Sequence, residues 1–385
     1  ANERQQFIAA AEHCHAHNVR FPNSLDEVQM LQSLGDSAFA RYLLGCFWYS
    51  KRRYDEAVSC WRETLEKSPD YAPAHRLLGV YSWNKQQDAT QALAYLQRAV
   101  ALEPDNARFL FELDFLQKLL ARPVHERLTT LVERKAVVLK RDDLTAELLS
   151  LWNASGHYAD AAAILDTRVF HPWEGGEGKI TGQYLLNQLH RALQFIERGA
   201  FKQATDCLKA ALRYPDNLGE GRLPGQTDND IWYLLGYCAE QAGDAQQAAE
   251  YYQLARQGGS TLDAGRYYND QPADYLFWQG IALRKSGNPA QAEQHFRHFI
   301  DWAAQHRDDV PQVDFFAVSL PDLVVLDVSA QQRHQQHCLF IEALGHLGLG
   351  NVSACQQRMQ QLLQINPAHD KAHLIRHALQ SGIFS

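Results

Sequence analysis

A small residue recurs at regular spacing along this chain, and this repeat constrains the fold more than any other feature. Three segments align around it, at residues 42–69, 233–255 and 277–299. Each reads large apolar residue, Gly, large apolar residue, a polar or Gly-containing turn, then Ala and an aromatic residue. Both halves have the 3.6-residue spacing of a helix, with turn signals between them. The pattern predicts one helical hairpin that is used many times.

The separations between equivalent small residues give the length of each unit. The small residues are Ala57, Ala92, Ala161, Ala204, Ala248, Ala292 and Cys355. Their separations are 35, 69, 43, 44, 44 and 63 residues. The first matches the roughly 34-residue period of the tetratricopeptide repeat, which the hairpin resembles. The second is two such periods, so a degenerate unit is expected at 106–140.

The repeat predicts an all-α fold, a right-handed α-solenoid of tetratricopeptide-type hairpins with long inter-repeat loops in its C-terminal half. Length alone would suggest two or three domains, but a solenoid buries one continuous core. We therefore expect a single domain over 1–385 with about nine hairpins. Its predicted parts are an early unit at 3–36 with LDEVQMLQSL as its second helix, regular repeats at 38–105, loop-extended repeats at 142–368 and a capping helix at 370–380.

Composition excludes several function classes. Apolar residues are 46% and charged residues 21%, which excludes wholesale disorder. The net charge of −8 argues against nucleic acid and anionic membrane surfaces as partners. No apolar run approaches the roughly 18 residues of a membrane span. The 7 scattered Cys have no C-x-x-C pair, which predicts reduced thiols in a cytoplasmic protein. The missing initiator Met is compatible with a trimmed N-terminus or with a fragment of a longer chain, and the fragment is the preferred interpretation.

From residue 161 onward, each unit carries extra residues after its second helix. They form four loops at 171–179, 214–228, 258–272 and 306–328. Insertions in solenoids usually lie on one face, often the binding face. The first two loops share Pro, three residues, Gly-Glu-Gly and a cation, which is an unusual match for simple spacers. The alternative is that Gly-Glu-Gly only shapes the turn, with Glu as a helix cap.

The four loops are rich in carboxylates, amides and aromatic rings. Such residues could dock a partner or an adjacent domain, bind a ligand such as a sugar, or contribute to catalysis. Docking is the preferred interpretation. The candidate residues are Trp173, Glu174, Glu177, Asn217, Glu220, Tyr267, Asn269, Asp270, Asp314 and Asp322.

The fourth loop contains the one strand-like passage of the chain, residues 314–328. It alternates poorly and contains Pro321. We expect an extended, buried segment that passes over the helices. Long insertions without their own secondary structure are often functional.

A second candidate surface is the concave groove. By resemblance to tetratricopeptide proteins, certain first-helix positions face it. An aromatic groove could hold an extended peptide or a helix, although aromatic residues at helical spacing are also typical of a core. The groove candidates are Tyr42, Tyr49, Trp83, Tyr233, Tyr237 and Phe277.

Metal, cofactor and catalytic sites are not expected. His13 and His17 share a helix face but lack partners for a tetrahedral set. The Gly-Gly-Glu-Gly run at 175–178 lacks the trailing Lys-Ser/Thr of a phosphate loop. No catalytic Cys, His and Asp arrangement is recognisable. We therefore expect no metal and no cofactor, and the chain alone is not expected to be an enzyme.

Nearly the whole chain also resembles the C-terminal half of large bacterial YphG-like proteins, whose function is poorly defined. The motifs that carry this resemblance are RFPNSLDEV (20–28), YSKRRYDEAVSCW (49–61), FHPWEGGEG (170–178), RYPDNLGEG (213–221), YYNDQP (267–272) and DFFAVSLPD (314–322). The resemblance implies a missing N-terminal β-rich region and a setting in sugar metabolism. It transfers no catalytic residue.

Two functions remain open. The first is an interaction scaffold that binds a protein partner, or the missing N-terminal domain, through the acidic and aromatic loops. The second is a carbohydrate-binding module that contributes to a glycosidase- or epimerase-like site of a larger protein.

Overall fold

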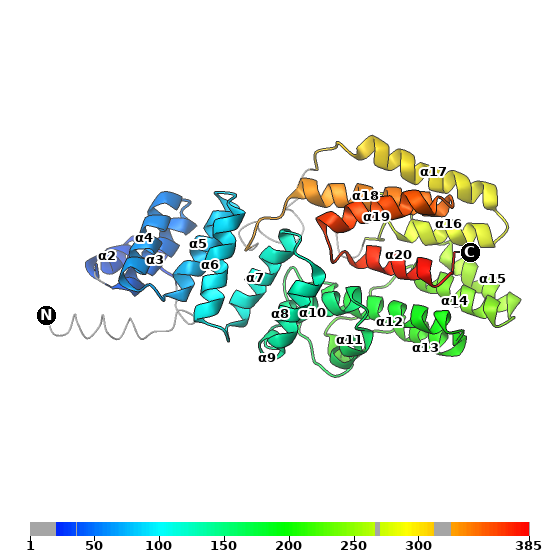
Figure 1. The fold of residues 1–385 in the computed structure, drawn as a ribbon, viewed down its shortest axis with the longest axis horizontal. Helices are drawn as coiled ribbons and strands as arrows, with labels where there is room; N and C mark the ends of the chain where they lie inside the picture. Colours follow the sequence, from blue (N-terminus) through cyan, green and yellow to red (C-terminus); the bar gives the residue numbers. More distant parts are fainter. Residues whose placement is uncertain (1–20, 36, 266–269, 312–324, 385) are drawn as a thin grey trace. The chain divides into compact units, whose positions relative to one another are not determined.

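The computed structural model describes residues 21–35, 37–265, 270–311 and 325–384. Within these residues all regular secondary structure is helical, from α2 (Leu25–Ser33) to α20 (Asp370–Gln380) (Figure 1). Most consecutive helices pair as hairpins. The predicted fold class, an all-α solenoid of tetratricopeptide-type hairpins, is confirmed.

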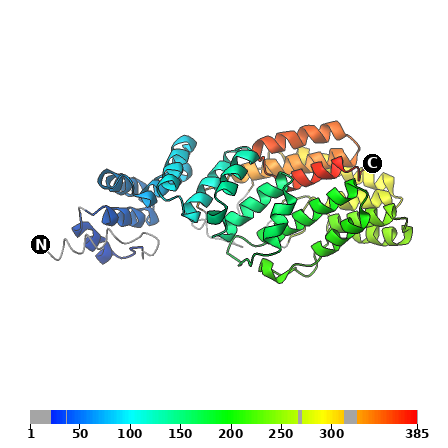
Figure 2. The same cartoon turned by 60° about the horizontal axis from the view of Figure 1, so that its bottom comes forward.

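The chain divides into two compact units. The N-terminal unit contains residues 1–120 and Val325–Asp327. Its hairpins are α3 with α4 and α5 with α6 (Figure 2). Besides α2, its helices are α3 (Ala38–Ser50), α4 (Tyr54–Lys67), α5 (Ala72–Asn84), α6 (Ala89–Leu102) and α7 (Ala107–Leu119). The single nine-hairpin solenoid over the whole chain stays a prediction.

The C-terminal unit contains 121–324 and 328–385. Its regular hairpins are α12 with α13, α14 with α15, α16 with α17 and α18 with α19. Besides α20, its helices are α8 (Val124–Glu133), α9 (Lys135–Val138), α10 (Asp142–Ala154), α11 (Tyr158–Leu165), α12 (Lys179–Glu197), α13 (Phe201–Ala211), α14 (Asn229–Gln241), α15 (Ala245–Ala255), α16 (Tyr275–Lys285), α17 (Pro289–His306), α18 (Ala330–Gly348) and α19 (Val352–Ile365).

Polar residues at the start of several helices explain why the helices begin there. Ser24 and Glu27 form a capping box on α2, in which each side chain satisfies a backbone N–H of the other. The side chains of Asp88 and Asn106 accept from free N–H groups of α6 and α7. The cap on α2 fits the prediction of LDEVQMLQSL as a helix.

The recurring small residues occupy the crossing points of the hairpins. Ala57, Ala92, Ala161, Ala204, Ala292 and Cys355 are all 0% exposed. The Gly of the facing helix makes room for a large partner. A Cβ on Gly45 would lie 2.3 Å from Trp61 Nε1, and one on Gly280 would lie 2.5 Å from Phe296 Cζ. The sequence pattern of a small residue, a Gly and an aromatic residue therefore reflects how the two helices of a hairpin pack against each other.

Replacing Gly45 by Ala should destabilise the N-terminal unit by about 1–3 kcal/mol. The added Cβ would clash with Trp61, which is 0% exposed and has nowhere to move. Replacing Gly182 by Ala is the matched control, because nothing lies within 4 Å of its added Cβ. That change should stabilise α12 by about 0.5–1 kcal/mol, since Ala is the better helix former. Urea unfolding of the two variants would show opposite signs. Equal signs would contradict this account of the glycines.

Helix α20 has the residues expected of it, but its packing is broader than that of a terminal cap. It contacts α10 and α12 as well as α19. Asp370 at its start accepts from Ser150 Oγ and Gln183 Nε2, each at 2.7 Å. After α20, the Ile383 carbonyl accepts from the Tyr233 hydroxyl at 3.2 Å, and the Phe384 ring centroid lies 5.4 Å from that of Phe277.

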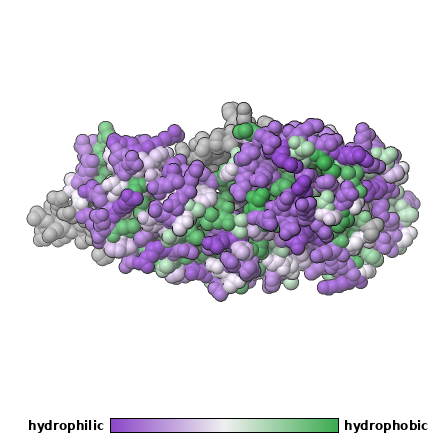
Figure 3. Space-filling view, turned by 45° about the horizontal axis from the view of Figure 1, so that its top comes forward, coloured by the Kyte–Doolittle hydropathy of each residue, from purple (hydrophilic) through white to green (hydrophobic). Residues whose placement is uncertain are grey.

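The extra residues of the later units lie where the spacing of the recurring small residues predicted them. They form the connections α11–α12, α13–α14, α15–α16 and α17–α18, each after the second helix of a hairpin. Hydrophilic residues predominate on the face drawn in Figure 3, with hydrophobic residues gathered in patches. Among the described residues, none of the helices has both the length and the apolar character needed to cross a bilayer.

Candidate functional site

The N-terminal unit holds a short stretch of its own chain on α5. We call residues 325–327 the groove segment. Asn84 binds its backbone with both ends of the side-chain amide: Nδ2 donates to the Val325 carbonyl at 2.9 Å, and Oδ1 accepts from the Asp327 N–H at 2.8 Å. Trp83 Nε1 donates to the Asp327 carbonyl at 2.9 Å. These contacts are made to backbone groups rather than to side chains, and the chain bends at Val325 and Leu326.

Two side chains of the groove segment, Val325 and Leu326, also pack on the apolar cluster of α5, α6 and α7. Leu326 is 0% exposed and belongs to the apolar cluster of α5, α6 and α7. Asp327 is exposed. Buried members of that cluster are Val80, Leu96, Phe109, Leu113 and Leu116. This apolar cluster therefore favours a bulky aliphatic residue at position 326, and the side chain at position 327 is exposed to solvent.

Tyr49 of α3 completes the polar side of this surface. Its side chain is hydrogen-bonded to Asn84, and burial raises the pKa of the Tyr49 phenol to about 12. The sequence predicted Tyr49 and Trp83 as groove residues, and both adjoin the groove segment. Asn84 was missed because a lone Asn at the end of a helix resembles any C-terminal polar residue.

The two loops with matching sequences pack against each other. The Phe170 N–H donates to the Asn217 carbonyl at 2.7 Å, and Asn217 Nδ2 donates to the carbonyls of Leu165 and Arg168, both at 2.8 Å. Gly219 has a left-handed φ of 79°, and a Cβ there would lie 2.6 Å from the Phe170 carbonyl oxygen. A residue without a side chain is needed at this approach. The sequence match therefore reflects a mutual contact between the loops.

Glu220 closes the same contact. Its carboxylate accepts from the Gly178 N–H at 3.0 Å and from the Thr181 hydroxyl at 3.3 Å. Gly178 precedes the first residue of α12, so Glu220 satisfies a free donor at that helix start. The sequence left open a capping role for the Glu of Gly-Glu-Gly. Glu220 has this role, and the helix that it caps is α12, which follows the first loop.

The remaining predicted residues of the first loop lie outside this contact. The Trp173 ring covers Gly176, where a Cβ would come within 2.0 Å of it, and Lys179 Nζ lies 6.0 Å from the ring centroid. Glu174 is exposed and Glu177 is partly buried. Trp173 therefore shapes its own loop.

Three of the four loops meet around one cavity, which we call the loop pocket. Its volume is about 500 Å³. One wall is a face of α12, and the others come from the loops and from the first residues of α14, α16 and α20. The lining residues are Gly178, Thr181, Gly182, Leu185, Leu186, Leu189, Tyr214, Gly225, Gln226, Thr227, Asp230, Ile231, Gly258, Gly259, Asp270, Gln271, Pro272, Tyr275 and Lys371.

A buried group of charges lies at the wall of the loop pocket. Lys371 Nζ is 3.1 Å from Asp274 Oδ2 and 3.7 Å from Asp230 Oδ2. Burial raises the pKa of the Asp230 carboxyl above its usual range, against the pull of Lys371. Burial alone would lower the pKa of Lys371, but Asp274 and Asp230 raise it, so the ammonium stays charged. The repeat pattern did not reveal this group, because Lys371 is more than 90 residues from both acids in the sequence.

The other predicted residues divide into two sets. Tyr267, Asn269, Asp314 and Asp322 lie outside the described residues. Tyr42, Tyr233 and Phe277 are 5%, 2% and 0% exposed, and Tyr237 is partly buried. Because residues that follow α20 pack on Tyr233 and Phe277, the structure places these two in the core rather than on an open groove.

Histidines form a second buried polar group, between α11, α12 and α20. His190 Nδ1 and His377 Nδ1 are 2.9 Å apart, and His377 Nε2 is 3.3 Å from Glu197 Oε1. The Tyr158 ring stacks on His190 with 4.7 Å between centroids. Burial lowers the pKa of His190 well below its ordinary value. Among the described residues, no cluster of three or more His, Cys, Asp or Glu side chains could hold a metal ion.

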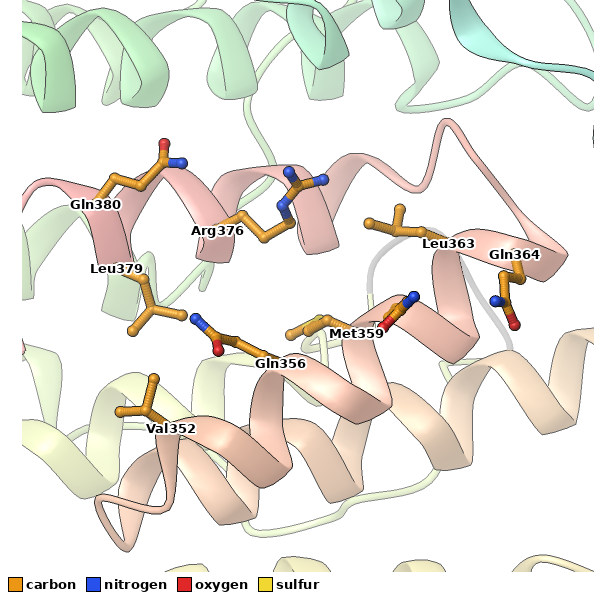
Figure 4. Close-up of a pocket in the computed structure, with 9 residues that line it drawn as sticks. Val352, Gln356, Met359, Leu363, Gln364, Arg376, Leu379 and Gln380 are labelled. Atoms are coloured by element: carbon orange, nitrogen blue, oxygen red, sulfur yellow. The ribbon is translucent and has the colours of Figure 1, made fainter.

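A further cavity of about 680 Å³ lies between α19 and α20. Val352, Met359 and Leu379 point toward the space between the two helices, and Gln356, Gln380 and Arg376 flank it (Figure 4). None of the residues predicted from the sequence lines this cavity.

Comparison with protein families identifies the repeat. The family model of the tetratricopeptide repeat matches residues 48–107 and 189–265. The chain contains tetratricopeptide repeats. The first match covers α4 to α6 of the N-terminal unit, and the second covers α13 to α15 of the C-terminal unit with parts of their neighbours. The resemblance to the YphG-like family stays a prediction.

Three solved structures are reported as similar to this chain. One is YrrB, described as a TPR protein with an unusual peptide-binding site, at 12% identity and a TM-score of 0.31 over 60% of this chain and 90% of that chain. Another is PilW, a type IV pilus biogenesis factor, at 16% identity and a TM-score of 0.30 over 56% and 90%. A third is Naa15/Naa10 bound to HypK-THB, at 13% identity and a TM-score of 0.41 over 99% and 62%.

Proposed function

We propose that this tetratricopeptide-repeat chain is a protein-interaction scaffold whose N-terminal unit binds a short non-helical segment of a partner. The observation that carries the proposal is the binding of the groove segment by Trp83 and Asn84. These side chains supply three hydrogen bonds to backbone groups, at 2.8–2.9 Å. A partner segment with the same backbone conformation offers the same groups, so the groove segment indicates which interactions a partner would make.

The preferred partner sequence follows from the burial of each position. The middle residue should be Leu or a similar aliphatic residue, because Leu326 fills the apolar cluster. Burying such a side chain contributes about 1.5–3 kcal/mol. The next residue can be acidic, because Asp327 is exposed.

A labelled peptide with the sequence of residues 325–330 would test this proposal. It should bind the full chain carrying Leu326→Asp, in which the chain's own segment can no longer fill the apolar cluster. Adding Asn84→Ala should weaken that binding by about tenfold or more, because two hydrogen bonds are lost. Fluorescence anisotropy measures both affinities.

Two controls accompany this titration. A peptide with Asp in place of Leu should not bind, and Asn366→Ala in the C-terminal unit should leave the affinity unchanged. If the native peptide fails to bind the folded Leu326→Asp chain, the groove is not a peptide site and the proposal fails.

The loops of the C-terminal unit are the second part of the scaffold proposal. Trp173, Glu174 and Asp270 would contact a protein partner or an adjacent domain of the same polypeptide. Support comes from the exposure of Glu174 and Asp270 and from the convergence of three loops on one pocket.

Carbohydrate binding is the second candidate function. The observation that favours it is the loop pocket itself, which combines hydroxyl and amide side chains with an apolar wall. Titration of the full chain with glucose and maltose would test it, and a saturable heat signal for either sugar would support it. The buried charges at the pocket wall, however, favour a different ligand.

A further inference from the structure

One ammonium serves two buried carboxylates at the wall of the loop pocket. Among the described residues that line the pocket, Lys371 is the one cation. Its Nζ lies 3.1 Å from Asp274 Oδ2 and 3.7 Å from Asp230 Oδ2. Asp230 and Asp274 are 2% and 6% exposed, so water screens neither of them well. One of these two carboxyl groups is therefore left without a cation of its own.

Asp230 is the less compensated of the two carboxylates. Its Oδ1 accepts from the Ile231 N–H at 2.9 Å. Its Oδ2 has Lys371 Nζ at 3.7 Å, which is beyond hydrogen-bond distance. A buried carboxylate without full hydrogen bonding is unfavourable, and a bound cation would relieve this.

Another part of the pocket wall is apolar. Leu185, Leu186 and Leu189 of α12 form it, together with Ile231 and Pro272. Tyr214 and Tyr275 also line the pocket. Aromatic faces attract cations, and Lys371 Nζ already lies 5.4 Å from the centroid of the Tyr275 ring. A ligand that matches both parts of the wall has an aliphatic chain that ends in a positive group.

We propose that the loop pocket binds an alkyl ammonium or guanidinium group, with the cation beside Asp230 and the aliphatic chain against Leu185 and Leu189. Such a group is present in free alkyl amines and in Lys or Arg side chains of a partner protein. The proposal concerns the C-terminal unit alone and does not depend on the groove segment.

Paired probes that differ only in charge test the proposal on the unmodified full chain. Nα-acetyl-lysine amide should bind about tenfold or more tightly than Nα-acetyl-norleucine amide, because only the first offers a charged hydrogen bond to Asp230. Saturation-transfer NMR detects the contacts, and calorimetric titration gives the affinities. Equal affinity of the two probes, or binding of glucose or maltose with no binding of the lysine derivative, would overturn the proposal.

Two probes distinguish the source of the cation. Tighter binding of 1-pentylamine than of the peptide Gly-Lys-Gly assigns the pocket to a free amine. The reverse order assigns it to a side chain of a partner protein. Failure of both amines to bind would overturn the proposal, whatever the result of the groove experiment.

Substitutions in the pocket give effects of opposite sign. Asp230→Asn should weaken binding of the lysine derivative by about tenfold or more. Lys371→Met should strengthen it, because the competing ammonium is removed while Asp230 and Asp274 remain. Glu250→Gln on the exposed face of α15 should change nothing. Melting curves identify variants that do not fold. The comparison of the lysine and norleucine derivatives uses the unmodified chain, so it does not depend on the folding of any variant. Weaker binding to a folded Lys371→Met chain would contradict the proposed placement of the cation.

Discussion

Replacing Glu112 by Ala is expected to destabilise the N-terminal unit by about 3–5 kcal/mol. Glu112 in α7 is 1% exposed and binds the guanidinium of Arg76 in α5 through two hydrogen bonds of 2.6 Å. Arg108 Nε adds a third at 3.0 Å. The substitution leaves Arg76, whose side chain is only 12% exposed, without its partner. A buried charge without its partner is the costly state.

Further variants distinguish the cost of leaving Arg76 unpaired from the net contribution of the Arg76–Glu112 ion pair to stability. The double variant Arg76→Met with Glu112→Met should recover most of the stability, because a buried ion pair and apolar residues of similar volume are often nearly equivalent. Glu56→Gln, which breaks the exposed pair with Arg53, should leave the free energy of unfolding nearly unchanged. Urea unfolding followed by tryptophan fluorescence measures all three. A double variant as unstable as Glu112→Ala would show that the pair contributes more than the avoidance of one unpaired charge.

The repeat pattern could predict the hairpins because each hairpin depends on neighbours in the sequence. Ala57 and Gly45 are close in the chain and meet at one helix crossing, so their spacing reports their contact. The same holds for the positions of the loops, which follow from counting residues between equivalent alanines. The helix at 370–380 was also predicted with the bounds it has.

The sites could be predicted only in part, because they join residues that are distant in the sequence. Loop convergence brings Gly178, Tyr214 and Asp270 to one pocket, and the matching loops at least indicated that two of them belong together. No sequence spacing relates Lys371 to Asp230, or Asn84 to Val325. Predicted groove residues such as Phe277 became core because residues after α20 cover them, which hairpin periodicity cannot show.

The C-terminal unit should lose stability as the pH falls below about 6.5, the ordinary histidine pKa, and α20 should be the first element affected. His369 caps α20 through Nδ1, which accepts from the Ala372 N–H at 3.2 Å. A protonated Nδ1 cannot accept. Burial lowers the pKa of His369 to about 4, although Asp370 and Asp274 raise it in part. Burial also lowers the pKa of His373 and of His377 on the same helix.

The direction of the effect follows from proton binding. The unfolded chain, with a histidine pKa near 6.5, binds more protons than the folded chain at every pH between about 6.5 and 4. The contribution of His369 is therefore fully present above about 6.5 and is lost as the pH falls toward 4. One unit of pKa corresponds to about 1.4 kcal/mol, and the side chain is partly exposed, so the loss is about 2–3 kcal/mol.

His369→Asn should remove most of this dependence while keeping the helix cap, since Asn is a good N-cap residue. His298→Asn, at an exposed position of α17, should leave the dependence unchanged. Urea unfolding at about pH 7.5, 6 and 4.5, on both sides of the ordinary histidine pKa, with amide hydrogen exchange to follow α20, measures both. If the stability of the unmodified chain were flat over this range, neutral His369 would not support the cap. If His369→Asn fell as steeply as the unmodified chain, His190, His373 and His377 would carry the acid sensitivity instead, because each is buried near α20 with a lowered pKa.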